Sequence, residues 1–295
     1  MTKRKELFAP AKINLVLCVL FRRPDGYHEL FTVFQKITLF DRLRVELTEA
    51  GLNLELAGPV KVPKEGNLCL KAAETFLATT GLKKGAKIRL YKEIPVGAGL
   101  GGGSSNAAAV LKALNELCRY PLTESDLLKL ARSIGADVPF FVSSYSTALA
   151  RGIGDILEPW PTHPAWYVLV FPGFKISTAW AYQNLRLTTR HKPPNYEPAQ
   201  PLWRQGLVND FETVVFETYP VLKTVKDFLL ELGAVAALLS GSGATVFGVF
   251  EEREEAQEAK EAIEKRGLKA LVVTNFREEE QGHVHQSFKD LRWSL

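Results

Sequence analysis

The first third of the chain alternates apolar or β-branched runs with turn residues. This spacing is typical of the strands of one sheet, and it predicts strands at 13–21, 31–39, 43–47, 52–56 and 86–91. A helix fits residues 67–79, between the last two of these strands. The opening part of the chain is therefore expected to form a sheet accompanied by a helix.

Helices and short strands follow this opening part. Residues 104–117 are rich in Ala and Leu and contain no helix breaker, so they predict a helix. Thr123, with an acidic residue three positions later, resembles a capping box that opens another helix, and this helix ends at Gly135. Short strands around Phe140 and Ala148 are expected to close this first unit.

From about residue 159 the pattern changes to strands that alternate with helices. A strand at 167–171 is followed by helices that begin near Ser177, near Phe211 and at Val221. The order strand, turn, strand, helix, strand then completes the pattern, and its helix falls in the highly charged segment 251–265. We expect this helix to be amphipathic, with one solvated face.

The change of pattern places a domain boundary near residue 158. The first domain would span 1–158 and the second 159–276, followed by a polar tail at 277–295. Two domains fit the length of 295 residues, since single cores stop growing near ~250 residues. Residues 192–201 contain four prolines and are expected to form an exposed loop.

The composition is that of an ordinary globular protein. Hydrophobic residues make up 46% of the chain and charged residues 24%, which excludes a disordered chain. The net charge of +4 is small and spread along the sequence, so neither nucleic acid nor a membrane surface is an expected partner. Cys18, Cys69 and Cys118 are isolated and predict buried thiols in the cytoplasm, with neither a disulfide nor a zinc site.

Residues 97–105 hold five glycines and two serines between a predicted strand and a predicted helix. Glycines allow the backbone to adopt positive φ and to approach a ligand closely. The first N–H groups of a helix lack internal partners and carry partial positive charge. This turn is therefore a candidate cradle for phosphate groups.

Two common phosphate loops do not fit this turn. Residues 97–102 match G-x-G-x-x-G, and Glu116 follows at about the 20-residue distance of a dinucleotide fingerprint. Glu116, however, falls inside the helix that the turn opens, whereas the ribose-binding acid should end the next strand. The Walker motif fails because no Gly-Lys-Ser/Thr follows the glycines.

Three segments in order resemble the motifs of the GHMP kinases, the family of galactokinase, homoserine kinase and mevalonate kinase. They are the first strand P-A-K-I-N-L at 10–15, the glycine-rich motif at 95–107 and the glycine turn between two strands at 239–245. Segments 24–30 and 135–141 look like the branch of this family that acts on a cytidine diphosphate derivative of methylerythritol in the non-mevalonate isoprenoid pathway. The resemblance extends from about residue 8 to residue 276.

This resemblance implies a fold, an activity and cofactors. The fold is α+β, with an N-terminal ATP-binding domain of the ribosomal-protein-S5-like type and a C-terminal ferredoxin-like substrate domain. The activity is transfer of the γ-phosphate of ATP, with Mg²⁺, to the 2-hydroxyl of the small-molecule acceptor. Nothing in the sequence indicates the oligomeric state.

Asp137 and Lys12 are the candidate catalytic pair. Asp137 lies between Gly135, which ends a helix, and Pro139, a setting that would hold its carboxylate rigidly as the base for the acceptor hydroxyl. Lys12 is the only charge in an apolar strand and is costly there unless paired. An ion pair with Asp137, which the resemblance also implies, would offset the free-energy cost of burying this charge. The alternatives are an Asp that caps a helix or lies in a turn and a Lys that reaches the surface.

The resemblance also implies the remaining site residues. Ser105 is one of the residues that would contact ATP, and it is also a candidate ligand of Mg²⁺. The acceptor would contact Asn14, Tyr27, His28, Thr178, Tyr182, Gly241 and Ser242. ATP would contact Asn67 and Leu68 near the adenine, and Pro95, Gly97, Ala98, Gly99, Leu100, Gly101, Gly102, Gly103, Ser104 and Ser105 near the phosphates.

Recognition of cytosine requires aromatic faces and a directional hydrogen-bond donor. Tyr27 and Tyr182 offer faces on which a base stacks, although Tyr182 has helix packing as its alternative. A neutral His28 would donate to the ring N3 of cytosine, where uracil carries a donor instead. His28 is therefore the candidate for specificity.

Three other functions stay open on the sequence. The nearest is another GHMP kinase, such as homoserine or mevalonate kinase, which would share the three motifs but has no need of the segment at 24–30. A nucleotide-binding module without activity would lose the base, so the presence of both Lys12 and Asp137 argues against it. A Rossmann oxidoreductase is the third alternative.

Overall fold

A computed structural model describes residues 4–187 and 193–277. Seven of the described strands form the first sheet, in the order β3-β4-β2-β1-β8, with β5 attached to β2 and β6 attached to β5. Most neighbours are antiparallel, while β3 with β4 and β1 with β8 are parallel. The strands are β1 (Arg4–Arg22), β2 (His28–Thr48), β3 (Leu52–Ala57), β4 (Gly85–Tyr91), β5 (Thr147–Arg151), β6 (Ile156–Pro159) and β8 (Val208–Asn209).

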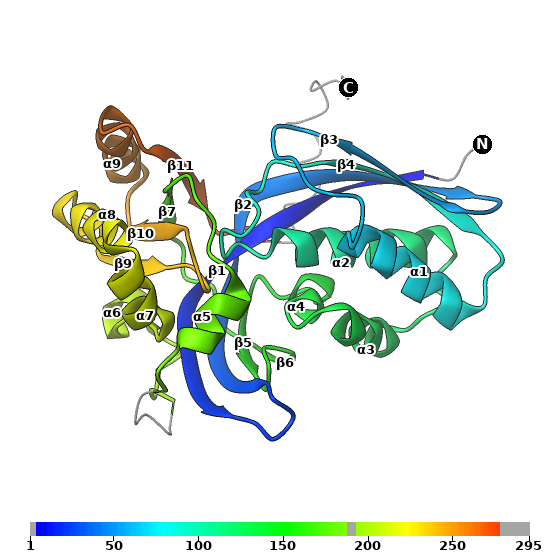
Figure 1. Cartoon of the computed structure of the whole chain (residues 1–295), viewed down its shortest axis with the longest axis horizontal. Coiled ribbons are helices and arrows are strands. Elements are labelled where there is room, and N and C mark those ends of the chain that lie inside the picture. The colour runs from blue at the N-terminus through cyan, green and yellow to red at the C-terminus, as the bar shows by residue number, and fades with distance from the viewer. Residues whose placement is uncertain (1–3, 188–192, 278–295) are drawn as a thin grey trace.

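The hairpin of β1 and β2 is the longest feature of the fold, and both strands bend along their length (Figure 1). The strands predicted separately at 31–39 and 43–47 are one continuous strand, so this prediction was wrong. The polar residues between them are not a turn, because Asp41 pairs with Ala9 of β1. A register shift after Pro10 accommodates the extra residues of β2 and keeps the ladder intact.

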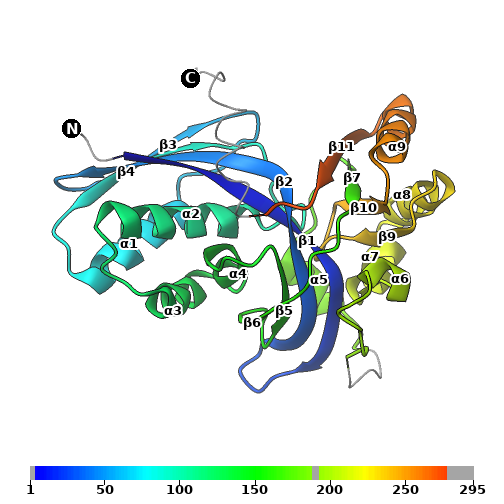
Figure 2. The same ribbon diagram turned by 180° about the vertical axis from the view of Figure 1, so that it is seen from behind.

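Four helices cover one face of this sheet (Figures 1 and 2). Thr123 caps the third of them by accepting from the backbone N–H of Asp126, which confirms the predicted start of this helix, and its hydroxyl also donates to the carboxylate of Asp126. Asn67 caps the first by accepting from the N–H of Cys69 at 3.0 Å. The helices are α1 (Leu68–Thr80), α2 (Gly102–Leu117), α3 (Glu124–Ile134) and α4 (Val138–Val142).

Helix α4 replaces the strand that was expected around Phe140. All five of its residues are buried, and the Phe140 ring packs against Phe34 at a centroid distance of 5.0 Å. A short apolar run has the same pattern in a buried strand and in a buried helical turn, and Pro139 near its start favours the helix. The expected strand at Ala148 is confirmed as β5.

The second half of the chain builds a four-stranded antiparallel sheet in the order β11-β7-β10-β9. Helices α8 and α9 pack on it, as the alternating pattern predicts. Its strands are β7 (Trp166–Phe171), β9 (Ala236–Leu239), β10 (Val246–Phe250) and β11 (Lys269–Thr274), and the helices are α5 (Thr178–Asn184), α6 (Leu202–Gln205), α7 (Phe211–Thr218), α8 (Pro220–Glu231) and α9 (Arg253–Lys265).

The two sheets share an apolar core. Ile13 and Val33 of the long hairpin pack in one buried cluster with Tyr167 and Phe247 of the second sheet. Strand β8 also joins β1, so a segment of the second half completes the first sheet. This continuity holds the two halves together at the base of the site described below. The boundary at residue 158 stays a prediction.

The remaining sequence predictions concern loops. Of the proline-rich segment, 193–201 is described and is largely exposed, but Tyr196 is buried and donates to the carbonyl of Gly206 at 3.0 Å. The predicted tail lies outside the described residues from 278 onward, and so does Lys192. No helix within the described ranges is long and apolar enough to span a bilayer.

Candidate active site

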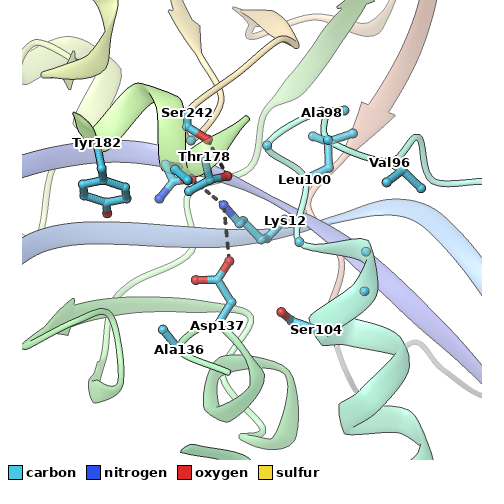
Figure 3. Close-up of a pocket in the computed structure, with 18 of the residues that line it drawn as sticks. Lys12, Val96, Ala98, Leu100, Ser104, Ala136, Asp137, Thr178, Tyr182 and Ser242 are labelled. Atoms are coloured by element: carbon cyan, nitrogen blue, oxygen red, sulfur yellow. Dashed lines mark hydrogen bonds and ion pairs between the residues drawn. The ribbon is translucent and has the colours of Figure 1, made fainter. Parts of the chain in front are cut away.

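A cavity of about 1190 Å³ lies where the first sheet, the glycine-rich turn and the second half of the chain meet. This volume exceeds the range of about 300 to 1,000 Å³ that holds a single small molecule, so two substrates can lie in it side by side. Every predicted site residue lines this cavity except Ser105. Figure 3 shows part of its lining.

Lys12 and Asp137 meet at the centre of the cavity (Figure 3). The Nζ atom of Lys12 lies 3.8 Å from Oδ2 of Asp137. Lys12 is only 4% exposed, so it does not reach the surface. Burial lowers the pKa of its ammonium group, and the carboxylate of Asp137 opposes this shift. Asp137 stands at the N-cap position of α4. Its carboxylate makes no capping hydrogen bond and faces the cavity instead (Figure 3).

A short chain of hydrogen bonds orients Lys12. Its Nζ donates to Oδ1 of Asn14 at 2.6 Å, and Nδ2 of Asn14 donates to Oγ1 of Thr32 at 2.8 Å. The Thr32 hydroxyl in turn donates to the carbonyl of Val16. Asn14 therefore has both ends of its amide engaged and fixes the lysine head group. Sequence reasoning missed Thr32, whose only signal is a hydroxyl within an apolar strand.

The glycine-rich turn is held in place by its backbone. Gly97, Gly99 and Gly101 have φ of +66°, +75° and +67°, which side chains other than hydrogen rarely permit. Gly101 is the N-cap of α2, so the free N–H groups of this helix open onto the cavity. The backbone N–H of Lys12 donates to the carbonyl of Leu100 at 3.0 Å and ties β1 to the turn.

The third motif packs directly on the glycine-rich turn. The Ser240 hydroxyl donates to the carbonyl of Gly99 at 3.0 Å. A Cβ at Gly99 would lie 1.9 Å from the carbonyl oxygen of Ser240. Asn209 holds the third motif from behind, because its Nδ2 donates to the carbonyls of Leu239 and Gly241 at 2.7 and 2.8 Å. The two glycine segments therefore form one unit.

The structure corrects the assignment of Ser105 to a metal ion. Ser105 is 1% exposed and does not line the cavity, and its buried hydroxyl has no partner among the described residues. Ser104, one residue earlier on the helix, faces the cavity instead (Figure 3). Successive side chains of an α-helix point about 100° apart, so only one of two adjacent serines faces a given ligand.

A buried charge cluster lies beside Asn67 and Leu68, and sequence reasoning missed it. Asp41 is fully buried and forms an ion pair with Lys92 at 2.5 Å. It also accepts from Nδ2 of Asn106 at 2.8 Å. Lys92 and Asn106 both line the cavity. Its signal in the sequence is that Asp41 interrupts an apolar strand pattern, which a turn between two strands would also explain.

The far end of the cavity carries the aromatic residues. The rings of His28 and Tyr182 stack with a centroid distance of 5.0 Å, while Tyr27 is 61% exposed. Tyr182 also packs edge-on against Phe211. One side of its ring is therefore in contact with a neighbouring helix, and another side lines the cavity. The pKa of His28 is lowered, first by burial and then by the charge of Arg22. Its imidazole is therefore neutral at pH 7.

The second half of the chain supplies hydroxyl groups between this end and Lys12 (Figure 3). The hydroxyls of Thr178 on α5 and Ser242 in the third motif lie 2.9 Å apart, and both line the cavity (Figure 3).

The alternative of a dinucleotide-binding fingerprint fails, since Glu116 lies within α2 and forms an ion pair with Lys5 at 2.6 Å. The cavity thus joins the glycine-rich turn at the start of α2, a carboxylate with a lysine and an aromatic end.

Two family models match the chain. The model of the GHMP kinases N terminal domain matches residues 67–145, and the model of the GHMP kinases C terminal matches residues 196–269. Among solved structures with low identity, homoserine kinase from Cytophaga hutchinsonii has 20% identity and a TM-score of 0.65 and covers 94% of this chain and 96% of its own. This likeness concerns the fold alone, and it confirms the expected α+β class.

More similar proteins share one name. A 4-diphosphocytidyl-2-C-methyl-D-erythritol kinase of Geobacter sp. is 45% identical over 278 residues, which are 92% of this chain and 99% of the relative. That of Pelobacter propionicus is 45% identical over 257 residues, 85% and 91% of the two chains. A crystal structure of 4-(cytidine 5'-diphospho)-2C-methyl-D-erythritol kinase has 40% identity and a TM-score of 0.78 and covers 92% and 98% of the two chains. The chain therefore belongs to the GHMP kinase family and, within it, to the 4-diphosphocytidyl-2-C-methyl-D-erythritol kinases.

Proposed function

We propose that the chain transfers the γ-phosphate of ATP to the 2-hydroxyl of 4-diphosphocytidyl-2-C-methyl-D-erythritol, giving the 2-phosphate and ADP. The observation that carries this proposal is the position of the Lys12–Asp137 pair, between the glycine-rich turn and the aromatic end of one cavity. The relatives that share the name of this activity match the chain over most of their length.

Asp137 is proposed as the general base. Its carboxylate would accept the proton of the 2-hydroxyl as the oxygen attacks the γ-phosphorus. Lys12, held by Asn14, would orient this carboxylate and place its charge near the phosphoryl group that moves. Phosphoryl transfer requires positioning and charge stabilisation more than covalent chemistry, and a buried lysine beside a carboxylate supplies both.

ATP is proposed to bind at the N-terminal ends of α2 and α1. Its phosphates would lie on the N–H groups at the start of α2, with Ser104 beside them. Its adenine would lie between Asn67 and Leu68 on one side and Lys92 and Asn106 on the other, since all four line the cavity.

Mg²⁺ is proposed as the cofactor. Among the described residues no group of three His, Cys, Asp or Glu side chains is placed to bind a metal. Ser104 and phosphate oxygens are therefore the proposed ligands, which suits a cation that retains several water molecules. When bound, Mg²⁺ would neutralise charge on the phosphates.

The acceptor is proposed to bind at the aromatic end. A base cannot enter between His28 and Tyr182, because rings 5.0 Å apart leave no room for a third ring with contacts of about 3.5 Å on each side. The cytosine would instead present its edge to His28 and its face to the exposed ring of Tyr27. Thr178 and Ser242 are proposed to bind polar groups of the acceptor.

A coupled assay of ADP release tests the proposed function. The chain should release one ADP per molecule of 4-diphosphocytidyl-2-C-methyl-D-erythritol and form its 2-phosphate. Homoserine and mevalonate, the acceptors of the enzymes with the same fold, should give no release above background. Turnover of either alcohol at a rate equal to that of the cytidyl acceptor would contradict the proposal.

We expect the cytidine acceptor to be preferred over its uridine analogue by about 10- to 100-fold in kcat/KM, the effect of one mismatched polar contact. The physical reason is that neutral His28 donates to N3 of cytosine but meets a donor in uracil. The variant His28→Ala should lower this ratio toward one, as measured by steady-state kinetics with both acceptors.

Tyr27→Leu is the matched control for this test. Stacking tolerates any base, so loss of the Tyr27 ring should weaken both acceptors to a similar degree and leave their ratio unchanged. A His28→Ala variant that keeps the full preference for cytidine would show that another residue recognises the base.

A further inference from the structure

Three lysine and arginine side chains of the described residues line the cavity, namely Lys12, Lys92 and Arg22. The first two have acidic partners in the protein, since Lys12 pairs with Asp137 and Lys92 with Asp41. Arg22 has no acidic partner among the described residues. A cation that lines a cavity without a counter-charge is available for an anionic ligand.

The neighbouring arginine differs from Arg22 in this respect. Arg23 is held by Asp25 at 3.1 Å and by Glu29 at 3.0 Å, and these contacts brace the turn between β1 and β2. Its charge is therefore neutralised within the turn. Arg22 ends β1 and is exposed at the rim of the cavity, with its charge unmatched by the residues that the structure describes.

Arg22 lies at the aromatic end of the cavity. It pairs with His28 in the register of β1 and β2, and its charge contributes to the lowered pKa of His28. The guanidinium group is therefore close enough to act electrostatically on the ring that is proposed to recognise the base. Lys12 and Asp137, in contrast, lie at the position of phosphoryl transfer.

The chemistry of the proposed acceptor calls for a cation near its base, where the linker begins. A diphosphate with two negative charges joins its cytidine to the alcohol that is phosphorylated. If the base lies at His28 and the hydroxyl at Asp137, this linker crosses the space between them. In the proposed arrangement the phosphates of ATP lie at the start of α2, so the linker requires positive charge from another group.

We propose that Arg22 binds the diphosphate linker of the acceptor and sets the affinity for cytidine diphosphate derivatives; this inference rests on the proposed function. The guanidinium group presents its N–H donors in a planar fork that matches phosphate oxygens. Arg22 thus recognises the part of the acceptor that is independent of the base.

The test compares Arg22→Met with two other variants. Arg22→Lys keeps the charge but loses the fork, and Lys223→Met changes the net charge equally on the exposed surface of α8, outside the cavity. For Arg22→Met we expect the KM for the acceptor to rise by about tenfold, while kcat and the KM for ATP change by less than about twofold. The KM of Arg22→Lys for the acceptor should lie between those of Arg22→Met and the parent protein, and the KM of Lys223→Met should equal that of the parent protein.

Binding of acceptor fragments distinguishes a contact with the linker from a contact with the nucleoside. Calorimetry should show that Arg22→Met weakens cytidine diphosphate by about the same tenfold factor and leaves cytidine unchanged. The loss should shrink as salt concentration rises, because the contact is partly exposed to solvent. Thermal melting of each variant checks that the fold is intact.

Two outcomes would overturn the inference. An Arg22→Met variant that binds cytidine diphosphate as tightly as the parent protein shows that Arg22 does not contact the linker. Equal weakening of cytidine and cytidine diphosphate shows that it contacts the nucleoside instead. If the parent protein fails to phosphorylate the cytidyl acceptor, the proposed function falls, whereas the calorimetric comparison still decides the role of Arg22.

Discussion

Replacement of Asp137 by Asn is expected to lower kcat by on the order of 10³-fold, the range for loss of a general base. The amide cannot accept the proton of the attacking hydroxyl, yet it keeps the shape of the carboxylate. ATP binding should change by less than about threefold, since the phosphates are proposed to lie at the start of α2 and not at Asp137. Steady-state release of ADP and calorimetric titration with ATP measure the two quantities.

Asp155→Asn is the matched control for this variant. Asp155 is a nearby carboxylate that pairs with Arg132 at 3.6 Å and does not line the cavity, and the activity of this control should stay within about twofold of the parent protein. Asp137→Asn should also lower the melting temperature, because buried Lys12 loses its counter-charge. Near-normal turnover by a folded Asp137→Asn variant would rule out the proposed base.

Replacement of Gly99 by Ala is expected to destabilise the fold by about 3 kcal/mol, from backbone strain and overpacking together, and to abolish tight binding of ATP. At φ of +75° an alanine is strained, and its Cβ would lie 1.9 Å from the carbonyl oxygen of Ser240. Either the glycine-rich turn or the third motif must move. Urea denaturation and the KM for ATP measure the two effects.

Gly103→Ala provides the comparison within the same segment. Gly103 lies in α2 without positive φ, and a Cβ there would meet only Leu68, at an ordinary contact distance of 3.6 Å. This variant should be as stable as the parent protein or more stable by up to about 1 kcal/mol, since alanine favours helices. Equal midpoints for Gly99→Ala and Gly103→Ala in urea would contradict the close packing of the two motifs.

Local patterns predicted most of the fold. The strand at 86–91, the glycine-rich turn and the helix at 104–117 follow in the structure as expected, and so do the cap at Thr123 and the helix that starts after Ser177. These features depend on residues that are neighbours in the chain, such as a capping side chain and the N–H group three positions later. Their physical causes are therefore visible in one short segment.

Elements that depend on distant partners were less predictable. The run around Phe140 is buried as a short helix that packs against Phe34, more than a hundred positions earlier. Asp41 does not form a turn, because β1 pairs with it, Lys92 neutralises its charge inside the core and Asn106 donates a hydrogen bond to it. A polar residue in an apolar run has the same local appearance in both cases.

The sequence by itself determined the order of the three motifs, the family they resemble and the residue types that phosphoryl transfer requires. Only the tertiary structure decided which of those side chains meet. It brings Lys12 within 3.8 Å of Asp137, turns Ser104 and not Ser105 toward the cavity, and leaves Arg22 without an acidic partner among the described residues. The reason is that a motif shows which residue types follow one another in the chain. The distances between side chains, their burial and their charge partners depend on segments that only folding brings together.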